Sequence, residues 1–174
     1  MFVVRGTQRF LGRVGAPVPE PGDETTRLGP WYATLARWRP QVALFVSEPT
    51  LLPVFVPLAS ARTVLGRFPQ ALGEVLTEHG VPQAWIAPEL AEMSDVVTAK
   101  TASRSVLGIM KEFLFLAGAH RAGDEGPDLL ALSVELAHTP CSPLYRRHVF
   151  PDRELAALVG ISGDVPARVR PAGP

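Results

Sequence analysis

The chain contains three consecutive strand-like runs: Trp31-Tyr-Ala-Thr-Leu-Ala-Arg-Trp38, Gln41-Val-Ala-Leu-Phe-Val-Ser47 and Leu51-Leu-Pro-Val-Phe-Val56. Only short, proline-containing breaks separate them, and connections this short join antiparallel neighbours, so we predict a three-stranded meander. The middle run is almost wholly apolar, which is typical of a central strand that is buried on both faces. Pro53 has no N–H group for the ladder and therefore predicts an edge strand or a bulge.

Further strand signals lie on both sides of the meander. The run Phe2-Val-Val-Arg5 predicts an N-terminal strand, and Thr7 predicts the cap of a short helix that follows it. Two weaker strand candidates are Ala84-Trp-Ile-Ala87 and Asp95-Val-Val-Thr-Ala-Lys100. Residues 15–30 are rich in Pro and Gly, and we expect a long mobile loop there.

Helical spacing of apolar residues appears in four other segments. Residues 59–79 show two apolar clusters with Pro69 between them, which predicts two helices, the second beginning at the proline. A wide apolar stripe follows Ser103 and predicts the best helix of the chain. Residues 127–137 predict a largely buried helix, and residues 153–159 a short one.

These elements predict an α+β fold. We expect a small, mainly antiparallel sheet, made of the meander Trp31–Val56 and the N-terminal strand, with three or four helices packed against one face. The length of 174 residues fits a single domain, which we assign to residues 1–159. Residues 160–174 are rich in Gly, Pro and Arg, and we predict a disordered tail.

Composition excludes several classes of protein. The chain is 47% hydrophobic and its 17 basic residues balance its 17 acidic ones, which excludes global disorder and disfavours a generic polyanion binder. Its single cysteine, Cys141, forms no internal disulfide and leaves no Cys₄ or Cys₂His₂ zinc site. No signal peptide and no run of about 20 apolar residues is present, so we expect a cytoplasmic protein without a membrane span.

The strongest candidate site lies at the start of the helix that follows Ser103. Free backbone N–H groups, two cations and three hydroxyls gather there, and together they favour an anion or a phosphate. The predicted anion-binding residues are Lys100, Thr101, Ser103, Arg104 and Ser105, together with Arg5 of the first strand. In the alternative interpretation, Ser103 only caps the helix and the cations face solvent. The segment is not a Walker loop, because no Gly-x4-Gly-Lys motif is present.

Other side chains favour structural interpretations. His138 and Cys141 could form half of a metal site or a thiol beside a base, but a lone cysteine in a turn is more often an inert buried residue. Glu89 and Glu92 fit an exposed helical turn, and their spacing predicts no metal site. Strand parity places Tyr32 and Trp38 on one face of the sheet, where packing explains them as well as base stacking does.

Several segments together resemble a known family. The segments are Leu28-Gly-Pro-Trp-Tyr-Ala-Thr-Leu35, Val42-Ala-Leu-Phe-Val-Ser47, Thr98-Ala-Lys-Thr-Ala-Ser-Arg-Ser-Val-Leu-Gly-Ile-Met110 and Leu136-Ala-His-Thr-Pro-Cys-Ser-Pro143. They resemble a bacterial domain family of unknown function, whose members occur alone or beside the plasmid ORF-3-like domain. The resemblance covers roughly residues 1–150. Ser103 and Thr34 stand where the family pattern has asparagine. The resemblance implies a soluble α+β domain and no particular activity.

Two functions fit the sequence. The first is a non-catalytic binding or accessory module with a protein partner, because no complete catalytic set is present. The alternative is a protein that binds nucleic acid or a nucleotide phosphate at the predicted anion site, with or without catalysis. The sequence predicts no cofactor and no metal, and it leaves open whether the protein is an enzyme.

Overall fold

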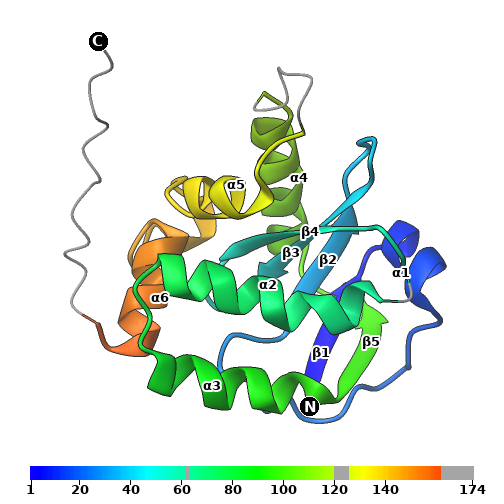
Figure 1. Cartoon of the computed structure of the whole chain (residues 1–174), viewed down its shortest axis with the longest axis horizontal. Helices are drawn as coiled ribbons and strands as arrows, with labels where there is room; N and C mark the ends of the chain where they lie inside the picture. The colour runs from blue at the N-terminus through cyan, green and yellow to red at the C-terminus, as the bar shows by residue number, and fades with distance from the viewer. Residues whose placement is uncertain (62, 120–125, 162–174) are drawn as a thin grey trace.

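The computed structural model describes residues 1–61, 63–119 and 126–161 (Figure 1). Within these residues the chain forms five strands and six α-helices. The strands are β1 (Phe2–Gly6), β2 (Trp31–Leu35), β3 (Val42–Ser47), β4 (Pro53–Pro57) and β5 (Val96–Lys100). The helices are α1 (Gln8–Val14), α2 (Val64–Glu78), α3 (Gln83–Ala91), α4 (Arg104–Ala119), α5 (Leu129–Leu136) and α6 (Pro151–Val159), with 3₁₀ turns η1 (Glu92–Ser94) and η2 (Ser142–Leu144).

The five strands form one mixed sheet in the order β4-β3-β2-β1-β5. The meander β2-β3-β4 is antiparallel, as predicted, and the wholly buried β3 lies between its neighbours. However, β1 runs parallel to both β2 and β5, so the prediction of a mainly antiparallel sheet was wrong. The reason is that about ninety residues of chain separate β1 from β5, and local sequence patterns do not reveal a pairing between strands so far apart.

Helices cover both faces of the sheet, whereas we predicted three or four helices on one face. Figure 1 shows α2 across the near side of the sheet and α4 on its far side. Strand parity places Trp31 in the cluster under α2 and Tyr32 in the cluster under α4. Trp38, which follows the end of β2, also packs in the cluster under α4. The predicted division of these three aromatic residues between the faces is therefore confirmed.

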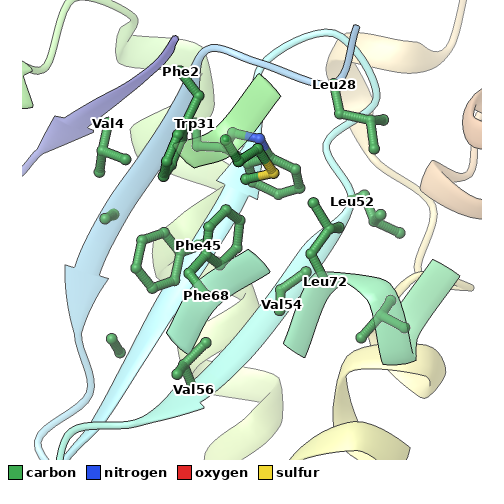
Figure 2. Packing of buried hydrophobic residues seen from close by; sticks show 14 of the residues in the cluster. Phe2, Val4, Leu28, Trp31, Phe45, Leu52, Val54, Val56, Phe68 and Leu72 are labelled. Carbon is green, nitrogen blue, oxygen red and sulfur yellow. The ribbon is translucent and has the colours of Figure 1, made fainter. Parts of the chain in front are cut away.

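Aromatic rings fill the core under α2 (Figure 2). Phe68 of α2 stacks on Phe45 of β3 with ring centroids 4.2 Å apart, and it meets Trp31 edge to face at 4.8 Å. Pro69, which we expected to separate two helices, lies inside α2. The continuous helix carries Phe68 and Leu72 into the same core, and this burial outweighs the local disruption by proline.

The β4 edge of the sheet is covered, which matters because an open edge invites pairing with other chains. Ser133 of α5 accepts a hydrogen bond from the backbone N–H of Phe55 at 2.9 Å and donates one to the carbonyl of Leu129 at 2.6 Å. Pro53 lies in this strand, so its prediction as an edge strand is confirmed. At the opposite edge, the backbone N–H of Val18 donates to the carbonyl of Thr98 at 2.8 Å.

Two predictions about the segment before β5 had different outcomes. The strand predicted at Asp95–Lys100 is confirmed as β5. The strand predicted at Ala84–Ala87 was wrong, because these residues belong to α3. Four apolar residues fit either element, and here Ile86 turns inward as part of a helix that packs beside α2.

Glu89 of α3 is buried, with 2% of its surface exposed, so the prediction of an exposed turn was wrong for this residue. Its carboxylate accepts hydrogen bonds from the backbone N–H groups of Arg27 at 3.0 Å and Leu28 at 2.9 Å. These contacts fix the end of segment 15–30, whose mobility stays a prediction. Of the predicted disordered tail, residues 162–174 lie outside the described residues.

Candidate functional site

The parallel pairing of β1 with β5 brings together two cations that lie 95 positions apart in the sequence. Arg5 is level with Ala99 in the ladder, and Gly6 is level with Lys100. The Arg5 guanidinium donates a weak hydrogen bond to the carbonyl of Lys100 at 3.4 Å. The carboxyl ends of parallel strands form a common ligand-binding edge in sheets with helices on both faces. The chain places Arg5 and Lys100 at such an edge.

Helix α1 forms one wall of this edge. Thr7 caps it by accepting a hydrogen bond from the backbone N–H of Phe10 at 3.4 Å, which confirms the predicted cap. A Cβ atom on Gly6 would lie 2.8 Å from the Leu11 side chain, so only glycine lets α1 pack this closely on the end of β1. Figure 1 shows α1 directly beside the tip of β5.

A cavity of about 740 Å³ lies between α1 and the end of β5. Its lining residues are Gly6, Gln8, Leu11, Gly12, Gly15, Ala16, Pro17, Lys100 and Thr101. A second hollow of about 480 Å³ shares Pro17 and Lys100 with the first, and Arg5, Val18, Pro19 and Ala99 complete its lining. Neither set includes an acidic residue.

The predicted anion-binding residues divide into two groups in space. Arg5, Lys100 and Thr101 line the two hollows. Ser103 accepts a hydrogen bond from the backbone N–H of Val106 at 3.3 Å and thereby caps α4. Arg104 and Ser105 are exposed and are not among the lining residues. An anion site that includes the start of α4 stays a prediction.

Sequence reasoning missed the wall formed by α1. Gly12, Gly15 and Leu11 carry no functional group, so nothing in their chemistry marks a site. The only signal is Gly12, an exposed glycine inside a seven-residue helix, where glycine is unfavourable.

Tyr32 and Glu48 form a polar contact near Arg5 that the sequence did not reveal. The Tyr32 hydroxyl donates to the Glu48 carboxylate at 3.1 Å, and burial, followed by the charge of Glu48, raises the pKa of Tyr32. Arg5 opposes this shift, which places its charge within reach of the same hydroxyl. Tyr32 lies level with Arg5 in the β1–β2 ladder.

The remaining nucleophilic and metal-binding side chains form no catalytic set within the described residues. Cys141 is buried, and desolvation raises the pKa of its thiol to about 12, which fits the predicted inert cysteine. His138 contacts the Val134 carbonyl at 2.9 Å rather than the thiol. No group of three His, Cys, Asp or Glu side chains among residues 1–61, 63–119 and 126–161 could hold a metal ion. His120 lies outside these residues.

A family model described as a domain of unknown function (DUF6933) matches residues 3–154 of the chain. The chain belongs to the DUF6933 family. The expected membership of an uncharacterised domain family is therefore confirmed, and the matched DUF6933 region includes β1, α1 and β5 of the candidate site. Comparisons with curated proteins and with solved structures gave no match. In the part of the DUF6933 chain that the structure describes, no helix combines the length and apolarity needed to cross a bilayer.

Proposed function

We propose that this DUF6933 domain is a non-catalytic binding module that holds a small organic anion, such as a nucleotide phosphate, at the carboxyl ends of β1 and β5. The observation that carries the proposal is the cavity of about 740 Å³ beside Lys100, with Arg5 lining the adjoining hollow. Pockets for small molecules typically measure about 300–1,000 Å³. The cavity is therefore of the right size for a ligand of this class.

The lining supplies two kinds of contact. Leu11, Ala16 and Pro17 offer an apolar surface for the organic part of a ligand. Lys100 is exposed and forms no ion pair within 4.0 Å with a described residue, so its charge is available to an anionic group. Arg5 is half-buried and adds a second positive charge from the adjoining hollow. We favour binding over catalysis because, among the described residues, no His, Cys, Asp or Glu lines either hollow to activate the Thr101 hydroxyl or the Lys100 amine.

Two finer expectations belong to the same proposal. The resemblance implies a bacterial protein whose relatives occur beside a plasmid ORF-3-like domain, and a binding module fits that accessory setting. A reducing cytoplasm suits a chain whose single cysteine is a buried free thiol.

Gly12 offers a direct test of the cavity. It lines the cavity, and a Cβ atom placed on it meets nothing within 4 Å, so we expect the Gly12→Leu side chain to take up part of the cavity. Replacing glycine inside a helix also removes an unfavourable contribution of about 1 kcal/mol, so the variant should be at least as stable as the wild type. Gly66→Leu is the matched control, because Gly66 is an exposed helical glycine of α2 with the same open surroundings.

Native mass spectrometry first shows whether the purified protein retains a ligand. A thermal-shift screen of small phosphate and carboxylate metabolites follows, and calorimetry then measures the affinity of each hit. A ligand at 100 times its dissociation constant stabilises the fold by about 2.7 kcal/mol. We expect anionic hits that Gly12→Leu abolishes, Gly66→Leu retains and Lys100→Ala weakens. A screen without anionic hits, or hits that bind equally to Gly12→Leu, would refute the proposal.

A further inference from the structure

A groove follows the C-terminal half of α2, and helices α5 and α3 form its other walls. Figure 1 shows these two helices on opposite sides of α2, and both pack against it. The groove consists of two hollows of about 390 Å³ and about 360 Å³, which share the lining residues Glu78 and Leu130. We call it the α2 groove. It is separate from the cavity of the candidate site, which lies at the ends of β1 and β5.

The floor of the α2 groove is apolar. Its larger apolar side chains are buried or half-buried and belong to Ile86, Leu90, Leu130 and Val134. Gly73 of α2 lets α3 approach closely, because a Cβ atom there would lie 2.9 Å from the Leu90 side chain. Apolar grooves between helices are typical docking sites for the apolar side chains of a peptide segment.

The rim of the α2 groove is negatively charged. Its four carboxylates belong to the exposed residues Glu74, Glu78, Asp128 and Glu135. No Lys, Arg or His is among the described residues that line either hollow. Glu74, Glu78 and Asp128 form no ion pair within 4.0 Å with a described residue. The groove therefore differs in sign from the cavity beside Lys100, which no described acidic residue lines.

Helix electrostatics does not explain these carboxylates. Glu78 is the last residue of α2 and Glu135 lies in the last turn of α5, where the helix dipole disfavours negative charge. Glu74 and Glu78 are four residues apart on one helix, a spacing at which like charges repel. Asp128, in contrast, caps α5 by accepting two hydrogen bonds from backbone N–H groups of that helix. A cationic partner across the groove would remove the repulsion between Glu74 and Glu78.

We propose that the α2 groove binds a basic segment of a partner protein, with apolar side chains in the two hollows and Arg or Lys side chains against the carboxylates. Charge complementarity identifies this occupant, because an acidic segment or a nucleic acid would be repelled by the rim. A metal ion does not fit, because no three His, Cys, Asp or Glu side chains of the described residues are placed to hold one. The proposal does not depend on the anion cavity.

Phage display of random peptides of about 12 residues on the full chain tests the chemistry of the occupant. We expect enrichment of peptides that combine Arg or Lys with Leu, Ile, Val or Phe. Fluorescence anisotropy then measures the dissociation constant of the most enriched peptide, which we expect in the micromolar range. Its affinity should fall as the salt concentration rises, because salt screens the contacts with the exposed carboxylates.

Charge reversal at Glu78 tests the rim. Glu78→Lys should weaken binding of the enriched peptide about tenfold. The variant should be at least as stable as the wild type, because a cation is favourable at the end of a helix. Glu112→Lys is the matched control, since Glu112 is an exposed glutamate of α4 that lines neither hollow, and it should bind the peptide as the wild type does.

A larger side chain at Ala131 tests the hollow between α2 and α5. Ala131 is exposed and lines this hollow, so we expect the ring of Ala131→Phe to take up part of it. Binding should weaken at least about tenfold, because the apolar side chains of the peptide lose their place. Ala157→Phe, at an exposed position of α6, is the control and should leave binding unchanged. Thermal melting should show that both variants are folded.

Each result decides the matter. A selection that enriches no peptide, or that enriches acidic ones, would overturn the proposal. So would a basic peptide that binds Glu78→Lys and Ala131→Phe as tightly as the wild type, because its site would then lie elsewhere. Sedimentation of the wild type adds one more outcome. Self-association that Glu78→Lys abolishes would show that a second copy occupies the groove, and a separate partner protein would then be the wrong occupant.

Discussion

His79 provides a titratable group inside the junction of three helices, and we expect it to make stability depend on pH. It ends α2, its side chain is only 8% exposed, and its ring stacks on that of His138 with centroids 6.0 Å apart. Its buried Nε2 has no hydrogen-bond partner among the described residues. A carboxylate oxygen of Asp152 in α6 lies 3.7 Å from the Nε2 atom of His138.

Burial is the main cause of a lowered pKa at His79, and the neighbouring His138 lowers it further. Asp152 acts in the opposite direction without restoring it, and the pKa of His79 falls to about 4. The unfolded chain takes up a proton at this residue below about pH 6.5, whereas the folded chain does not until about pH 4. Stability due to this group is therefore complete above about pH 6.5 and is lost as the pH falls towards about 4.

The magnitude follows from the two pKa values. Between about pH 7.5 and about pH 5 the wild type should lose about 2 kcal/mol of unfolding free energy through His79 alone, and the full shift corresponds to about 3 kcal/mol. Other titratable groups of the chain add their own pH dependence. The difference between the wild type and a variant without the imidazole isolates the histidine contribution.

The assay is urea unfolding of the wild type, His79→Gln and His79→Leu across this pH range. One replacement is polar and the other apolar, so each has its own packing effect at neutral pH. Both should flatten the pH dependence by the same amount, about 2 kcal/mol. If both variants lose stability in acid as steeply as the wild type does, His79 is already protonated in the folded chain and the reasoning from burial is refuted.

Two further predictions concern hydrogen bonds made by the side chains of Glu89 and Thr7. Glu89→Ala leaves the partly buried N–H of Arg27 and the buried N–H of Leu28 without an acceptor, and it should lower the unfolding free energy by about 3 kcal/mol. Glu89→Gln keeps one acceptor and should lower it less, and urea unfolding compares the two variants. Thr7→Ala removes the cap of α1 and should cost about 1 kcal/mol, whereas Thr7→Ser should retain most of it. Equal losses in the two members of either pair would contradict these assignments.

Local patterns predicted the elements that local chemistry controls. Pro53 could not donate to a ladder, and it lies in an edge strand as expected. Thr7 and Ser103 cap the helices that they were expected to cap. The errors occurred where tertiary packing decides, because Pro69 is carried inside a helix by the burial of Phe68, and Glu89 is buried because a distant loop needs its carboxylate.

The candidate site was predictable only in part, for the same reason. Arg5 and Lys100 were both recognised as cations near the ends of predicted strands. Their proximity depends on the parallel pairing of β1 with β5, which neither strand encodes alone. The sequence therefore drew attention to Lys100 but assigned it to the start of α4, and it gave no reason to include α1.

The composition of α1 supports a role for the cavity that stability alone does not explain. A seven-residue helix is too short to be stable by itself, and Gly12 weakens it further. Its buried side, with Phe10 and Leu11, and its Thr7 cap supply the compensation. Gly12 is exposed and lines the cavity, and a Cβ atom placed on it would meet no neighbour within 4 Å. A helix that omits a stabilising side chain at the position that keeps a cavity open is expected when the cavity is used. If Gly12→Leu raises the unfolding free energy and abolishes ligand binding, the glycine serves the ligand rather than the fold.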